Sequence, residues 1–349
     1  HPVTRLGPLS VCAASHAGSV SPLFRNSPMN TPFVVPVNPD SACQPPSTKD
    51  FLVDRTFRAL ARIGVVLVLA LVFALVFEVG RKALPGMEKH GFDVLLGSVW
   101  DVNQGKYGIL PAIWGTLYSA LIALLIAGFF GVSMAIFLTQ DFLPAKLAAV
   151  FRTIVELLAA IPSVVYGLWG IYVVIPAIRP LTAWLNTELG WIPFFGTFLS
   201  GPGLLPAALV LAIMILPTIA AVSQDALTAV PMKTKQAAYG MGTTHWEAIL
   251  KVMVPSAATG IFGSLVLGLG RALGETMALA MLVGNANNIS LSLFAPANTL
   301  AALLALNFPE AGPNEIEVLM YAALVLMLIT LIVNVFGSMI MMYAQRGNK

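Results

Sequence analysis

Residues 223–255 read S-Q-D-A-L-T-A-V-P-M-K-T-K-Q-A-A-Y-G-M-G-T-T-H-W-E-A-I-L-K-V-M-V-P, and residues 268–285 read G-L-G-R-A-L-G-E-T-M-A-L-A-M-L-V-G-N. The first stretch is polar and has the prolines and glycines of a loop in water. The second belongs to an apolar run that opens at Ala257. Ionisable side chains are costly to bury in lipid, yet this run holds Arg271 and Glu275. The two stretches together predict a water-exposed loop that leads directly into a membrane span with two charged residues.

The composition indicates that most of the chain lies in a membrane. Of its 349 residues, 58% are hydrophobic and 10% are charged, with a mean hydropathy of +0.85, whereas a soluble domain carries about 25% charged residues. The net charge of +3 argues against a nucleic-acid partner. No two of the four histidines lie at ligand spacing, and Cys12 and Cys43 match no metal signature. We therefore expect no metal ion and no cofactor.

Six stretches are long and apolar enough to cross a bilayer, which takes about 20 residues. They are Ile63–Val79, Ile113–Leu138, Ile154–Ile178, Leu204–Val222, Ala257–Val283 and Glu317–Tyr343. Pro162, Pro176 and Pro217 fall in the third and fourth stretches, where prolines kink helices or mark their ends. The pattern predicts an all-α polytopic membrane protein with six transmembrane helices.

The chain divides into three regions. Residues 1–50 are rich in Pro, Ser and Asn and are predicted to be disordered, because they cannot bury enough apolar surface to offset their ordering entropy. The first methionine is Met29, which predicts that translation starts there. Residues 51–112 hold the first transmembrane helix and an outer loop, and residues 113–345 hold the other five helices.

The distribution of Lys and Arg predicts the orientation. With the N-terminus inside, the cytoplasmic segments carry more Lys and Arg than the outer loops do, although Arg81 and Lys82 count against this orientation. Six spans bring both termini to the same side. Residues 223–256 are therefore predicted to be cytoplasmic.

The cytoplasmic loop carries local helix signals. Pro231 suits the first turn of a short helix that stops at Gly240 or Gly242. The sequence T-H-W-E at 244–247 is a capping box that starts a second helix, and Pro255 is expected to end it. The two helices form either a rigid protrusion for a partner or an ordinary interfacial loop.

The charged residues of the fifth span allow two interpretations. Arg271 lies near the middle of that span, and Glu275 follows at i+4, where the two side chains can pair on one helix. One interpretation is a structural ion pair between helices. The other is a path for an anion, because a guanidinium offers two parallel donors to an oxyanion.

Hydroxyl side chains also stand at two helix breaks. Ser163 follows Pro162, and Thr218 follows Pro217. Backbone N–H groups freed at such breaks can face an anion. The hydroxyls can equally well satisfy the broken backbone.

The loop resembles a motif of the permeases of ABC importers. Gln236-Ala237-Ala238-x3-Gly242-x9-Val252-x-Val254-Pro255 is similar to the family's E-A-A-x3-G-x9-I-x-L-P loop, with Gln236 in place of the usual glutamate. The resemblance implies that residues 113–345 form a type I, MetI-like permease core. It also implies that Gln236, Ala237, Ala238, Gly242 and Pro255 belong to a coupling loop, 223–256, that docks into a cytoplasmic ATPase.

Three further strings resemble the PstC-type permeases of phosphate ABC importers. They read G-T-L-Y-S-A-L-I-A-L-L-I-A at 115–127, L-L-A-A-I-P-S-V-V-Y-G-L-W-G at 157–170 and G-L-G-R-A-L-G-E-T-M-A at 268–278. The resemblance implies that Arg271 and Glu275, with Thr276 beside them, lie on the phosphate path, to which Ser163 and Thr218 are candidate additions. It implies the cell inner membrane, a homologous PstA-type second permease, two copies of an ATPase subunit, an extracytoplasmic phosphate-binding protein and surrounding lipid.

Other functions leave parts of the sequence unexplained. The only Gly-Lys pair is Gly105-Lys106, and Trp100 stands where a P-loop needs its first glycine, so the chain is not expected to be the ATPase itself. A membrane-embedded enzyme is not expected either, because the spans contain no His/Cys/Asp constellation. A secondary transporter that works without ATP leaves the 223–256 protrusion without a role. An arginine in the membrane serves sulfate, molybdate or phosphonate as well as phosphate, so these oxyanions stay open as alternatives.

Overall fold

The computed structural model describes residues 48–102, 104–140 and 142–347. The predicted disordered tail, Met29 and both cysteines lie outside this part, except that residues 48–50 already belong to the first helix. The chain divides into two compact units, 1–73 and 74–349, and α1 (Thr48–His90) runs through the boundary between them.

The described part is almost entirely helical, and six of its helices are long and apolar enough to span a membrane, which confirms the predicted number. The elements after α1 are α2 (Asp93–Leu96), β1 (Trp100–Asp101), β2 (Lys106–Tyr107), α3 (Leu110–Thr139), α4 (Ala145–Ala160), α5 (Ser163–Trp169), η2 (Gly170–Val174), α6 (Ile175–Leu189), α7 (Leu204–Thr228), α8 (Met232–Gly240), α9 (His245–Glu247), η3 (Ala248–Met253), α10 (Val254–Leu273), α11 (Met277–Leu282), α12 (Leu300–Asn307), η4 (Phe308–Glu310) and α13 (Pro313–Gly347).

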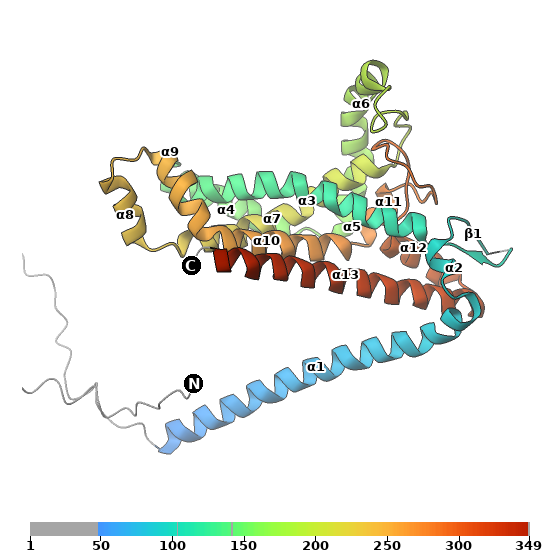
Figure 1. Cartoon of the computed structure of the whole chain (residues 1–349), viewed down its shortest axis with the longest axis horizontal. Helices are drawn as coiled ribbons and strands as arrows, with labels where there is room; N and C mark the ends of the chain where they lie inside the picture. Colours follow the sequence, from blue (N-terminus) through green and yellow to red (C-terminus); the bar gives the residue numbers. More distant parts are fainter. Residues whose placement is uncertain (1–47, 103, 141, 348–349) are drawn as a thin grey trace, which may run out of the picture. The chain divides into compact units, whose positions relative to one another are not determined.

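The core is a bundle in which α7 lies between α3 and α10, and α13 packs on the other side of α10 (Figure 1). Small residues allow this close approach, as expected in lipid, where helices have no hydrophobic drive to associate. Gly260 of α10 lies against Ala226 of α7, and Gly268 lies against Ile219. The buried hydroxyls of Ser223 and Ser264 join the same two helices with an Oγ–Oγ distance of 2.8 Å.

The segment before α3 folds into a small cap. Strands β1 and β2 form an antiparallel hairpin in which Trp100 pairs with Tyr107 and Asp101 with Lys106. The rings of Trp100 and Tyr107 meet edge to face with centroids 5.4 Å apart. The hairpin packs on a cluster formed by the end of α1, α12 and the start of α13, which includes Ala83, Leu300 and Val318.

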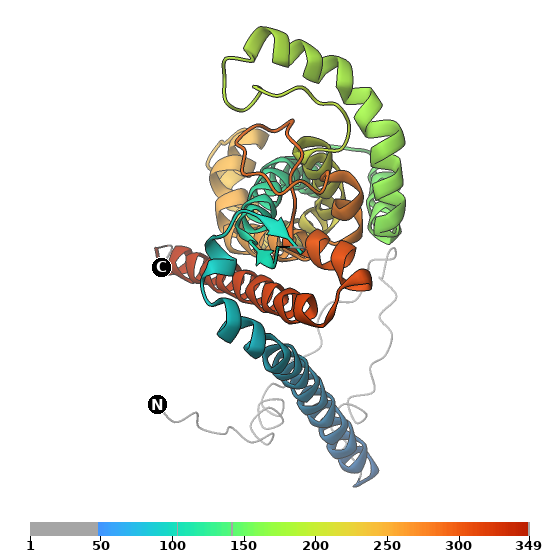
Figure 2. The same ribbon diagram turned by 90° about the vertical axis from the view of Figure 1, so that its right-hand side faces the viewer.

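The third span differs from the prediction. The expected helix Ile154–Ile178 is two elements, because the chain breaks at Ile161 and Pro162, both in extended conformation, and α4 ends before the break. The Tyr166 hydroxyl crosses the break and donates to the Leu158 carbonyl at 2.8 Å. The apolar helix that qualifies as a span is Ser163–Leu189. Its last section, α6, runs across the end of the bundle rather than along it (Figures 1 and 2).

The fifth span also differs, at both of its ends. Pro255 does not end the helix that Thr244 starts, because α9, η3 and α10 form one continuous helix. The π-helical turn η3 lies directly before Val254-Pro255, as η2 does before Ile175-Pro176. A π turn moves the carbonyl that the proline ring would otherwise meet. At the other end, α10 stops at Leu273 and α11 starts at Met277, so the predicted helix Ala257–Val283 is broken.

Candidate functional site

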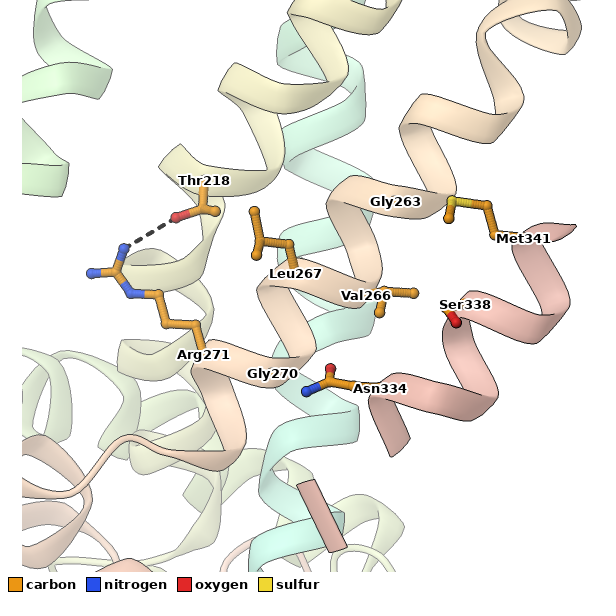
Figure 3. A pocket seen from close by; sticks show the side chains of 9 residues that line it. All are labelled: Thr218, Gly263, Val266, Leu267, Gly270, Arg271, Asn334, Ser338 and Met341. Atoms are coloured by element: carbon orange, nitrogen blue, oxygen red, sulfur yellow. Dashed lines mark hydrogen bonds between the residues drawn. The ribbon is translucent and has the colours of Figure 1, made fainter. Parts of the chain in front are cut away.

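Arg271 occupies the last turn of α10, next to this break, and its side chain is exposed. Its Nη1 donates to the Thr218 Oγ1 on α7 at 3.1 Å. Both residues line a cavity of about 540 Å³ between α7, α10 and α13 (Figure 3). The structure therefore brings together two of the predicted path residues, from spans 53 positions apart in the sequence.

The ion pair that the i,i+4 spacing of Arg271 and Glu275 allows is not formed in the described part of the chain. Within the described residues no carboxylate pairs with Arg271. An i,i+4 contact needs a continuous helix, and α10 ends between the two residues. The Glu275 Oε1 instead accepts the Ala278 N–H at 3.4 Å, which places this carboxylate at the start of α11. Arg271 is thus held by a neutral hydroxyl and keeps its full charge for another partner.

Thr276 and Ser163 stand at the starts of two neighbouring helices. Thr276 is the residue before α11, and its Oγ1 donates to the Gly274 carbonyl at 3.2 Å. Ser163 is the first residue of α5. Gly167 of α5 lies against Ala278 and Met281 of α11, and Gly170, just after α5, against Leu282, so the two helices run in the same direction. No hydrogen bond in the described part joins Ser163 to Arg271.

The cavity also contains residues that the sequence did not single out as path residues. Asn334 and Ser338 of α13 line it on the side of α10 opposite to the Arg271 guanidinium (Figure 3). Gly270 separates them from Arg271, and a Cβ at Gly270 would lie 3.0 Å from the Asn334 Oδ1. The available signal in the sequence was their spacing, because Asn334 and Ser338 lie one helical turn apart and so share a face of the last span.

The coupling loop has the local structure that its sequence predicts. Helix α8 ends at Gly240, and Gly242 adopts φ +81°, a conformation that favours glycine. Both halves of the predicted capping box are present, since Glu247 N–H donates to the Thr244 Oγ1 and Thr244 N–H to the Glu247 carboxylate. The loop turns between these two helices (Figure 1).

Of the predicted coupling residues, Gln236, Ala237 and Gly242 are exposed, whereas Ala238 is buried. Pro255 is exposed on the continuous helix that leads to Arg271. Large apolar side chains surround the exposed positions, and Met241 is 86% exposed. Such a surface in a water-exposed loop is typical of a docking site.

The loop is attached to the connection between α3 and α4. The His245 Nε2 lies 3.1 Å from the Gln140 carbonyl oxygen, to which it donates. The ring of Phe142 packs edge to face on His245 at 4.9 Å and lies 4.8 Å from the ring of Trp246. Helix α9 is therefore packed against the connection between α3 and α4.

Comparisons with known proteins agree with this architecture. Residues 127–347 match the family model described as the binding-protein-dependent transport system inner membrane component. The "Phosphate transport system permease protein PstC" of Xylella fastidiosa (strain Temecula1 / ATCC 700964) is 38% identical over 85% of this chain and 93% of its own length. The PstC protein of Mesorhizobium japonicum is 39% identical over 81% of this chain and 88% of its own.

A solved structure shares the fold. The inward-facing MetNI methionine ABC transporter has a chain with a TM-score of 0.51 and 20% identity, covering 68% of this chain and 95% of that one. The bundle is therefore a MetI-like ABC permease fold. The chain belongs to the family of binding-protein-dependent transport system inner membrane components, and it is a member of their PstC-type permeases.

Proposed function

We propose that this chain is the permease subunit of an ATP-driven importer and that it translocates inorganic phosphate across the cell inner membrane. The observation that carries the proposal is the Arg271 side chain, which lies unpaired with any described carboxylate in a cavity between three membrane helices. The names of the PstC relatives support phosphate as the anion.

Arg271 supplies the attraction for the anion. Its Nη1 is partly occupied by Thr218, which fixes the guanidinium while leaving further N–H donors for an oxyanion. A neutral hydroxyl holds the arginine without neutralising it. In this proposal the anion also passes the starts of the adjacent helices, where Thr276, Glu275 and Ser163 lie. The carboxylate of Glu275 weakens the retention of an anion that has passed Arg271.

Energy comes from outside the chain. The importer contains two copies of a cytoplasmic ATPase subunit, and one of them docks on the coupling loop of this chain. The exposed residues Gln236, Ala237 and Gly242 form its contact surface, with Ala238 packed beneath them. Motion of the docked ATPase reaches Arg271 through one continuous helix, which passes Pro255. In this arrangement both termini face the cytoplasm.

Two further partners complete the importer. A homologous PstA-type permease forms the other side of the path. A second chain is needed there because one arginine per chain is little charge for a dianion. An extracytoplasmic phosphate-binding protein delivers the substrate. The permease core extends over residues 113–345, and the supporting family match covers 127–347.

The test is phosphate uptake by vesicles that contain the whole complex. Arg271→Ala is expected to lower uptake by tenfold or more, because a hydrogen bond to a charged group is worth about 1.5–3 kcal/mol and 1.4 kcal/mol is a factor of ten. Arg271→Lys keeps the charge without the planar fork and should give intermediate uptake. Normal uptake by the alanine variant would show that Arg271 is structural. Uptake of sulfate at the rate of phosphate would reject phosphate as the specific substrate.

Docking of the ATPase has a separate test. Lys235→Glu together with Gly242→Asp should leave ATP hydrolysis in the complex but lower phosphate uptake per ATP. Lys106→Glu, on the β2 strand of the outer hairpin, is the control for reversal of a single charge. Unaltered coupling in the loop variant would contradict the docking proposal.

A further inference from the structure

Two adjoining cavities lie at the end of α3 that meets the coupling loop. One, of about 440 Å³, is lined by Arg152 and Thr153 of α4 and by the last turn of α3. The other, of about 510 Å³, is apolar. The cavities share Phe137, Leu138 and Leu143, so they form one continuous groove.

The apolar cavity extends along α3 toward the centre of the membrane span. Its lining reaches from Leu138 back to Phe130, eight positions or about 12 Å of helix. Phe151 of α4 and Leu216 of α7 form its walls, and Ser133 is its only hydroxyl-bearing lining residue among those described. Phe130 is 57% exposed, so the groove is open on one side.

Arg152 provides the positive charge at the mouth of the groove. With the amide oxygen of Gln224 turned toward the guanidinium, that oxygen accepts from Nε at 2.8 Å and from Nη2 at 2.9 Å. Nη2 also donates to the Leu138 carbonyl at 3.4 Å. Within the described residues no hydrogen bond occupies Nη1, and no ion pair joins Arg152 to Glu156, one turn further along α4.

We propose that this groove binds an anionic phospholipid, whose phosphate contacts the free edge of Arg152 and whose acyl chain lies along α3 between Phe130 and Phe137. Basic pockets between transmembrane helices at the membrane surface bind anionic headgroups in this way. The proposal places a membrane boundary at the end of α3, because Gln140 just beyond it contacts His245 of the coupling loop.

The position of the groove favours a lipid, rather than the second permease, as its occupant. Leu216 lines the groove and Thr218 lines the cavity of Arg271. Two positions on a helix differ by about 200°, so the two residues face in opposite directions from α7. A partner that completes the anion path at Arg271 therefore leaves the groove facing the bilayer.

The experiment measures phospholipid retained by the purified full-length chain in native mass spectrometry, after exchange into micelles doped with equal parts of phosphatidylglycerol and phosphatidylcholine. The unaltered chain is expected to retain phosphatidylglycerol preferentially. Arg152→Gln should weaken this retention about fivefold, the equivalent of about 1 kcal/mol for one cation near the surface. Lys146→Gln removes a charge from the same helix outside both cavities and should retain the lipid normally.

A second variant tests the acyl chain independently of Arg152. Ser133→Phe fills the apolar cavity without touching the guanidinium and should also release the phospholipid. Equal retention of the two lipids by the unaltered chain, an equal effect of Lys146→Gln, or full retention by Ser133→Phe would each overturn the proposal. Complete displacement by inorganic phosphate would show that the site recognises a free anion and not a lipid.

Discussion

Replacement of Gly268 by alanine should destabilise the contact between α10 and α7 on which the position of Arg271 depends. A Cβ at Gly268 would lie 2.8 Å from Cγ1 and 2.9 Å from Cδ1 of Ile219. Carbon atoms in contact are separated by about 3.5–4.0 Å, so the two helices or the isoleucine must move by about 0.7 Å.

Ile219 has no room to give way. It is fully buried, and on its other side Gly131 of α3 approaches so closely that a Cβ there would lie 3.0 Å from the Ile219 Cγ2. Overpacking of this kind costs about 1–3 kcal/mol. Alanine is favoured over glycine in a helix interior by about 1 kcal/mol, which offsets part of this cost, so the net loss of stability is expected to be up to about 2 kcal/mol.

Gly263→Ala is the matched control, because it lies on the same helix and a Cβ there would meet only the Met341 sulfur at 3.6 Å. The assay is unfolding of the purified chain in detergent, followed by circular dichroism. Gly263→Ala should be as stable as the unaltered chain or more so, and Gly268→Ala less stable. Ile219→Val removes one of the two clashing carbon atoms and should restore part of the loss in the double variant. Equal stability of the two alanine variants, or no rescue by valine, would refute the packing argument.

Three further outcomes are expected. Thr218→Val removes the hydroxyl that holds Arg271. Phosphate uptake should fall about tenfold or more, because a hydrogen bond to a charged group is worth about 1.5–3 kcal/mol; unchanged uptake would show that the contact does not position the arginine. Gly242→Ala places a side chain at φ +81°, which costs about 1–2 kcal/mol, so amide hydrogen exchange in α8 and α9 should accelerate. Gly240→Ala is the control, because a Cβ there meets open space, and it should leave the exchange rate unchanged. Pro255→Ala should not lower the thermal unfolding midpoint, because a π turn already accommodates the proline; a lower midpoint would mean that the proline itself stabilises this turn.

The sequence by itself determined the features that depend on short stretches of chain. Six apolar runs predicted six spans, because the number of apolar residues in one run decides whether it can cross a bilayer. Thr244 and Glu247 predicted the helix start in the coupling loop, since a capping box joins residues three positions apart. Arg271 was recognisable as a candidate site residue because an arginine in a span is costly wherever the helix packs.

Only the tertiary structure decided what Arg271 contacts. Glycines are frequent in continuous transmembrane helices, so Gly274 did not reveal that α10 ends beside it. The helix break moves Glu275 to the start of α11 and leaves Thr218, from a distant span, as the partner of the arginine. A helix in a bundle can end where neighbouring helices provide hydrogen-bond partners for its freed backbone groups. Those partners come from residues far apart in the chain, so a short stretch of sequence does not reveal the helix end.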